Sequence, residues 1–172
     1  GQWHDLPQPF WVVATQNPAE QMGTNPLPES QLDRFLIQVS LGYPDEQSEK
    51  RMLARAFEAR RGSPVTALNI NIEEERAKAQ RVNIADNVLD YLYRLVVEPR
   101  NTTHFQRGLS PRAALGLVAL SKAWAYLHRR DYVLPDDVQH VFPYVATHRV
   151  AANTTRSSLA ITMVLNTVPI HA

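Results

Sequence analysis

The sequence predicts a fragment of an α/β core followed by an all-α helical bundle. Two apolar runs near the start, residues 10–15 and 35–41, have the composition of strands that are buried on both faces. After Gly42 the pattern changes, because apolar residues then recur at helical spacing. Strands followed by a run of helices indicate two parts, which we place at residues 1–43 and 44–172.

Composition is typical of a folded, soluble protein. Of the 172 residues, 44% are hydrophobic and 20% are charged, which is close to the globular average. The formal net charge of +1 gives no electrostatic argument for binding nucleic acid or an anionic membrane. No run approaches the roughly 20 apolar residues of a membrane span, so we expect a cytoplasmic protein with no membrane partner.

Cysteine and histidine usage argues against several site chemistries. Cysteine is absent, which excludes disulfides, thiolate nucleophiles and cysteine-based zinc sites in this stretch. The 6 histidines are scattered and no two are four residues apart, as a helical metal clamp requires. We therefore expect no metal site.

The first predicted strand ends in polar residues, Gln16 and Asn17 before Pro18. Ligands bind at the carboxyl ends of strands in open α/β sheets, so Asn17 stands where a ligand could be held. An asparagine before proline also forms turns without any ligand, and spacing alone favours that simpler interpretation. A loop rich in glycine and proline follows, and residues 29–33 then predict a short helical turn.

The helices are predicted from their start signals and their apolar spacing. Pro44 opens the first, Asn83 and Asp86 form a capping pair for another that Pro99 ends, and Ser110 caps the longest. The predicted helices span about residues 44–61, 73–81, 83–99, 111–130 and 135–145, with Pro143 bending or shortening the last. The tail from residue 151 is open between a short helix and a strand.

The apolar positions on these helices predict one core. We expect the bundle to fold by itself, because its helices offer complementary apolar faces and are joined by short connections. On the longest helix the inward face is predicted from Ala113 to Leu127 in alternating steps of four and three. The core is predicted to contain Leu92, Leu117, Leu120, Trp124, Val138 and Val141.

Three motifs together resemble the MoxR family of AAA+ ATPases, which are P-loop NTPases. They are A-T-Q-N-P at 14–18, P-E-S-Q-L-D-R-F at 28–35 and G-L-S-P-R-A at 108–113. The stretch R-D-Y-V-L-P-D-D-V at 130–138 also fits, so the resemblance covers nearly the whole chain. It implies the carboxyl-terminal portion of such an enzyme, with a core remnant at 1–43 and a helical lid at 44–172.

The resemblance implies a role in ATP hydrolysis for three residues. Asn17 corresponds to sensor 1, which holds the attacking water or the γ-phosphate. Arg34 corresponds to an arginine finger that acts in trans on the nucleotide of a neighbouring subunit, and Arg112 corresponds to sensor 2.

Simpler roles are open for both arginines from the sequence alone. Arg34 could pair with Asp33 or Glu29, its neighbours on one helical turn. Arg112 lies in the first turn of a helix, where the dipole disfavours a cation by about 0.3 to 1 kcal/mol, so its position favours a compensating anion. On the functional interpretation that anion is a phosphate. On the structural one Arg112 pairs with Asp90 or Glu98, or is simply a solvated surface arginine.

The phosphate-binding motifs of such enzymes are missing from these residues. There is no G-x-x-x-x-G-K-[ST] loop, and the Asp45-Glu46 pair opens a helix instead of ending a strand. We expect Walker A and Walker B upstream of this stretch, which alone should not hydrolyse ATP. The resemblance also implies a sheet in which the strand before Walker A lies between the two predicted strands. That strand is missing from these residues, so the two should pair with each other, pair with a second copy, or be poorly ordered.

The resemblance implies ATP and Mg²⁺ as cofactors of the full-length protein, a hexameric assembly, and chaperone-like remodelling of protein clients. A magnesium-chelatase-type ATPase subunit is an alternative from the same branch. A helical nucleic-acid-binding module over residues 102–120 is another, although the near-zero net charge argues against it.

Overall fold

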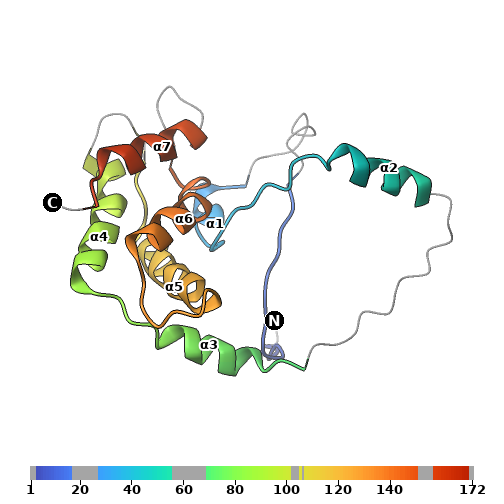
Figure 1. Ribbon diagram of the computed structural model, residues 1–172, viewed down its shortest axis with the longest axis horizontal. Helices are drawn as coiled ribbons and strands as arrows, with labels where there is room; N and C mark the ends of the chain where they lie inside the picture. The colour runs from blue at the N-terminus through green and yellow to red at the C-terminus, as the bar shows by residue number, and fades with distance from the viewer. Residues whose placement is uncertain are drawn as a thin grey trace. The chain divides into compact units, whose positions relative to one another are not determined.

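The computed structural model describes residues 3–16, 27–55, 69–101, 105, 107–150 and 157–170 (Figure 1). The chain forms two compact units, one from residues 1–38 with 71–172 and one from residues 39–70. The elements of the described residues are α1 (Glu29–Leu32), α2 (Glu46–Arg55), α3 (Ile72–Gln80), α4 (Asp86–Asn101), α5 (Pro111–Leu127), α6 (Pro135–Ala146) and α7 (Ser157–Thr167).

The smaller unit contains α2, which begins where the sequence predicts. Asp45 caps it, because its carboxylate accepts from the Ser48 amide at 2.9 Å and from the Ser48 hydroxyl at 2.7 Å. These bonds, the one from the hydroxyl above all, lower the pKa of Asp45. Met52 and Leu53 are exposed, and the expected continuation to residue 61 lies outside the described residues.

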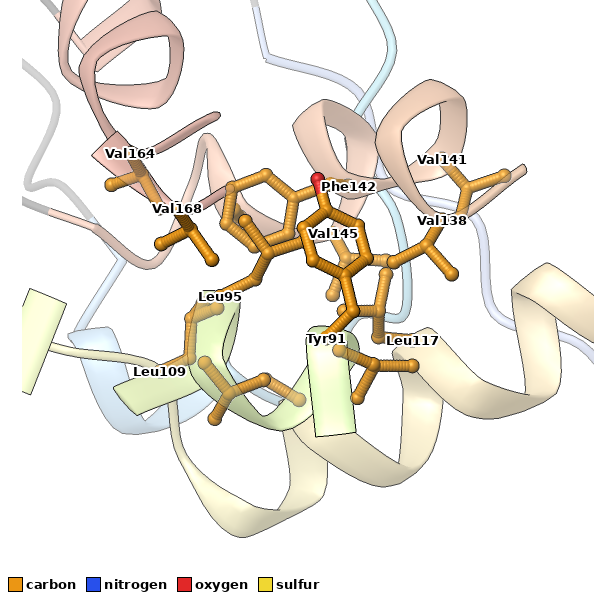
Figure 2. Packing of buried hydrophobic residues seen from close by; sticks show 14 of the residues in the cluster. Tyr91, Leu95, Leu109, Leu117, Val138, Val141, Phe142, Val145, Val164 and Val168 are labelled. Carbon is orange, nitrogen blue, oxygen red and sulfur yellow. The ribbon is translucent and has the colours of Figure 1, made fainter. Parts of the chain in front are cut away.

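The larger unit is a bundle in which α4, α5, α6 and α7 enclose one core. Side chains from all four helices meet in this core, with Tyr91, Phe142 and Val145 near its centre (Figure 2). The predicted cluster is confirmed: Leu92, Leu117, Val138 and Val141 are buried, and Leu120 and Trp124 are half-buried against it.

The inward face of α5 differs from the predicted one. Its buried residues are Ala113, Leu117, Ser121 and Ala125, a row at a constant step of four. Small side chains in this row let α5 lie close to α6, with which it packs most extensively. Leu127, which was expected to face inward, is therefore 73% exposed.

Two predicted boundaries of α4 are wrong. Asn83 does not cap the helix, because its backbone forms a parallel bridge with Tyr132, donating to Asp131 at 2.8 Å and accepting from Val133 at 2.9 Å. Pro99 does not end the helix, which continues to Asn101. Pro99 is fully buried, and packing there outweighs the one backbone hydrogen bond that a proline removes.

The two segments predicted as strands do not form a β-ladder. Residues 10–16 belong to no helix or strand within the described ranges, and Trp11, Val12 and Val13 are 67%, 65% and 87% exposed. The Gln38 amide instead donates to the Tyr144 carbonyl at 2.9 Å. A strand exists only by pairing, and the described residues do not supply the missing neighbour, so the apolar composition alone could not produce these strands.

The tail, left open by its weak periodicity, is the helix α7. Ala160, Ile161, Val164 and Val168 are buried, and α7 packs against α4 and α6. No helix in the described part of the chain is long and apolar enough to cross a membrane.

Candidate functional site

The segment that carries Arg34 lies against the helical bundle. α1 and the residues after it run beside the end of α6 (Figure 1), and both belong to the larger unit. Gly116 on α5 makes room for this segment, because a Cβ there would lie 2.7 Å from the Cδ1 of Leu36. The segment is therefore docked on α5 and α6.

Asp33 joins this segment to the start of α5. Its carboxylate accepts from the Ser110 hydroxyl at 2.9 and 3.0 Å, and the Ser110 oxygen accepts from the Ala113 amide at 3.1 Å. Ser110 is the N-cap of α5, as predicted, and it also reaches across to the residue before Arg34. We call Asp33, Ser110 and Arg149 the Asp33 node.

Arg149 is the third member of the node and is buried, with 4% of its side chain exposed. Its Nε–H donates to the Asp33 carboxylate at 2.9 Å. Its two terminal nitrogens donate to the backbone carbonyls of residues 33, 35, 36 and 145. A guanidinium has five N–H donors, and these five bonds use all of them.

His148 lies beside the node and contacts the same segment. Its Nε2 is 3.0 Å from the Phe35 carbonyl oxygen, which can only accept, so Nε2 carries the proton. Nδ1 is buried and has no hydrogen-bond partner among the described residues. Burial, together with the nearby charge of Arg149, lowers the pKa of His148 below its usual value.

Arg34 itself is exposed and makes neither of the pairs considered from the sequence. Asp33 is paired with Arg149, and Glu29 forms an ion pair with Arg107. Among the described residues, no carboxylate or carbonyl accepts from the Arg34 guanidinium. The arginine is thus free for an external anion, while the residue before it is fixed.

Arg112 is likewise exposed, in the first turn of α5. It makes no ion pair with Asp90, Glu98 or another acidic side chain in the part of the chain that the structure describes. Its guanidinium is therefore exposed to solvent without a partner among the described residues, which fits a solvated surface arginine and equally leaves the group open to an anion.

The loop before α5 is fixed to the end of α4. Arg100 donates from Nε and from a terminal nitrogen to the Leu109 carbonyl at 2.8 and 2.6 Å. Gly108 passes so close that a Cβ would lie 2.3 Å from the Cγ of Arg100 and 3.0 Å from its backbone nitrogen. The G-L-S-P-R-A motif thus presents Arg112 from a constrained turn.

The structure does not place every predicted site residue. Asn17 lies outside the described residues. Arg34 and Arg112 are presented by segments that the Asp33 node joins. No group of three or more histidine or acidic side chains in the described ranges is placed to hold a metal ion.

Sequence reasoning missed Arg149, His148 and Arg107. A signal for Arg149 exists, since it follows an apolar helix whose last carbonyls need donors, and cations are favoured there. That signal points to a helix cap, and it gives no hint of a partner 116 residues away.

Two protein-family models match the two stretches of the chain that carry these residues. A family model of the AAA lid domain matches residues 97–162, which include Ser110, Arg112 and Arg149. A second model, described as ATPase family associated with various cellular activities, matches residues 1–37, which include Asn17 and Arg34.

Curated relatives of this chain include a protein that carries the MoxR name. Chaperone MoxR1 of Mycobacterium tuberculosis is 36% identical over 163 residues, covering 87% of this chain and 42% of that protein. The uncharacterized protein YeaC of Bacillus subtilis is 38% identical over 155 residues, covering 87% of this chain and 48% of YeaC. The chain thus spans about half the length of the curated relatives it matches.

A solved structure has the same fold. A candidate ATPase from Cytophaga hutchinsonii matches with a TM-score of 0.80 and 31% identity, covering 96% of this chain and 56% of that one. Fold, motifs and relatives agree, and the fold class expected from the sequence is confirmed. The chain belongs to the MoxR family of AAA+ ATPases.

Proposed function

We propose that this chain supplies an arginine finger, Arg34, and a sensor 2 arginine, Arg112, to ATP hydrolysis in an oligomeric MoxR-type ATPase. The observation that carries the proposal is that both guanidinium groups are exposed and unpaired among the described residues, while hydrogen bonds fix the backbone beside each. Such fixed cations suit a transition state whose negative charge spreads over the γ-phosphoryl oxygens.

Arg34 and Arg112 suit the terminal phosphate of a bound nucleotide. Two free arginines can hold the terminal phosphate oxygens, whereas the sequence has no loop to hold the α- and β-phosphates and no strand ending in Asp-Glu to hold Mg²⁺. Bound Mg²⁺ would neutralise the phosphate charge. Walker A and B then belong to the upstream part of the full-length protein, and the 172-residue chain alone is inactive.

The proposed parts are a core remnant at residues 1–43 and a helical lid at 44–172, with Asn17 acting as sensor 1. Family matches to residues 1–37 and 97–162 support this division. Residues 33–38, which follow α1 and which we call the finger segment, are bonded to Arg149 of the bundle, so we propose that they move with the lid.

The two arginines of one chain are proposed to act on one nucleotide, that of a neighbouring subunit. Asp33 precedes Arg34, and its hydrogen-bond partner Ser110 lies two residues before Arg112. An arginine finger acts on the nucleotide of a neighbouring subunit. Because Arg112 is joined to Arg34 through the bond between Ser110 and Asp33, we propose that it faces the nucleotide of that same subunit. Self-association, as a hexamer, is therefore required for turnover, and the MoxR1 name supports chaperone-like work on protein clients.

Substitution in the full-length protein tests these roles. Arg34→Ala should lower ATP turnover by about 10³-fold and leave nucleotide affinity nearly unchanged, because a finger stabilises the transferring charge more than the bound ground state. Arg112→Ala should weaken both. Steady-state turnover and the affinity for a fluorescent ATP analogue separate the two effects.

Arg76→Ala, which removes an exposed arginine on α3, is the control and should match the wild type. Wild-type turnover in either site variant would remove that arginine from the site. Equal, mild losses in both variants would count against the assigned roles.

A further inference from the structure

We propose that Arg149 is a positioning residue for Arg34, so that the placement of the finger depends on the helical bundle. The proposal rests on the function proposed for Arg34. The observation behind it is that the buried side chain of Arg149 donates to the backbone carbonyls of Asp33 and Phe35, the residues on either side of exposed Arg34.

The bonds of Arg149 bracket Arg34. They reach the carbonyl and carboxylate of Asp33 on one side, and the carbonyls of Phe35 and Leu36 on the other. The Arg34 amide is held in turn by the Gln31 carbonyl at 3.1 Å. With these backbone groups fixed, the remaining freedom of the finger is in its own side-chain torsions.

The same guanidinium is anchored to the bundle. It donates to the Val145 carbonyl in the last turn of α6, and the carboxylate it pairs with also accepts from the N-cap of α5. A shift of α6 or of the start of α5 would therefore move the backbone of Arg34. Arg112, two residues after Ser110, shares this support.

Lysine cannot replace this arginine. Its ammonium has three donors on one nitrogen, whereas the five acceptors here are distributed around a planar, forked group. Arg149→Lys keeps the charge and can keep the Asp33 ion pair, but it leaves several carbonyls without their donor. The finger backbone then loses its hold while the buried charge remains paired.

The test uses the full-length protein with Arg149→Lys. Turnover per site should fall about 10- to 100-fold, since a misplacement of about 1 Å costs that much, while nucleotide affinity stays within about twofold and the assembly keeps its size. Arg94→Lys is the matched control: Arg94 is a half-buried arginine of the same bundle that donates to the Ile170 carbonyl at 3.1 Å. An equal loss in the control would overturn the proposal, because loosening of the bundle would then explain it.

A double variant separates positioning from general structure. If Arg149 acts through Arg34, Arg34→Ala together with Arg149→Lys should be no slower than Arg34→Ala alone. Losses that multiply would overturn the proposal, and so would full turnover in Arg149→Lys. If Arg149→Lys does not fold, Asp33→Asn takes its place in the same measurements. That substitution removes the negative charge to which the Arg149 Nε–H donates.

Hydrogen exchange keeps this proposal separate from the function it rests on. In the full-length protein, Arg149→Lys should speed exchange of the amides in residues 33–38, including the Gln38 amide bonded to Tyr144, and Arg94→Lys should not. Unchanged exchange overturns the positioning role. If exchange rises but Arg34→Ala leaves turnover intact, the positioning holds and the finger role of Arg34 fails.

Discussion

At the scale of single residues, the site depends on which charges are already neutralised. Asp33 and Glu29 were the simple partners for Arg34, and each is bound to another arginine. Buried Arg149 satisfies its whole guanidinium within the protein. Exposed Arg34 and Arg112 satisfy none of theirs among the described residues. The arrangement thus divides the arginines into structural and available ones.

We expect the stability of the folded chain to depend on pH through His148, which contacts the finger segment. Its pKa in the folded chain lies below the usual 6.5, because burial and then Arg149 disfavour the charged ring. Between the two pKa values the unfolded chain binds more protons than the folded chain. The contribution of His148 is therefore complete above about pH 6.5 and is lost as the pH falls below it.

We expect the free energy of unfolding in urea to fall between pH 7 and pH 5.5, and His148→Gln to flatten this fall, because glutamine can still donate to Phe35 without titrating. The same slope in the wild type and in His148→Gln would show that His148 is not the group that titrates.

At the scale of elements, helices were predictable and strands were not. α5 and α6 begin where the predicted cap and prolines indicate, and α3 begins at Ile72, next to its predicted start, because a helix satisfies its backbone locally. Residues 10–15 have a strand composition, yet a strand needs a neighbour. Arg34 and Arg112 could be singled out from motifs, whereas Arg149 could not, because its partners are distant in sequence.

Gly108, just before α5, packs closely against Arg100 at the end of α4, and a substitution can test this contact. Gly108→Ala should lower the free energy of unfolding by about 1 to 3 kcal/mol, because the added Cβ meets the backbone of Arg100 as well as its side chain. Gly116→Ala should cost less, since its Cβ meets only the flexible Leu36 side chain and alanine favours the helix. Urea unfolding measures the free energy of unfolding of both variants. If Gly108→Ala is as stable as Gly116→Ala or more stable, the close packing of Gly108 against Arg100 is contradicted.

At the scale of the whole molecule, the buried apolar core of the described residues lies between Val82 and Val168. The sequence led us to expect a bundle that is complete by about residue 145. The structure adds α7, whose Ile161 and Val164 close the core together with Val168, which follows the helix. The finger segment is docked on this core and does not form part of it.

We therefore expect residues 71–172 to fold alone, with a cooperative urea transition and helical circular dichroism. A version ending at residue 148 should lose cooperativity, because removing α7 exposes the face of α4 and α6 that it covers. Cooperative unfolding of that shorter version would show that α7 adds little to the core.

The bond between Arg149 and Asp33 closes a loop of 116 residues, which gives it a place in the order of folding. Helices form from contacts a few residues apart, whereas long-range contacts incur the entropy of loop closure first. During synthesis, Asp33 emerges well before Arg149 has been made. Arg149 can therefore hold this segment only after α6 has been made, and a ribosome-bound chain stalled before α6 would present Arg34 without the Arg149 bonds on either side of it.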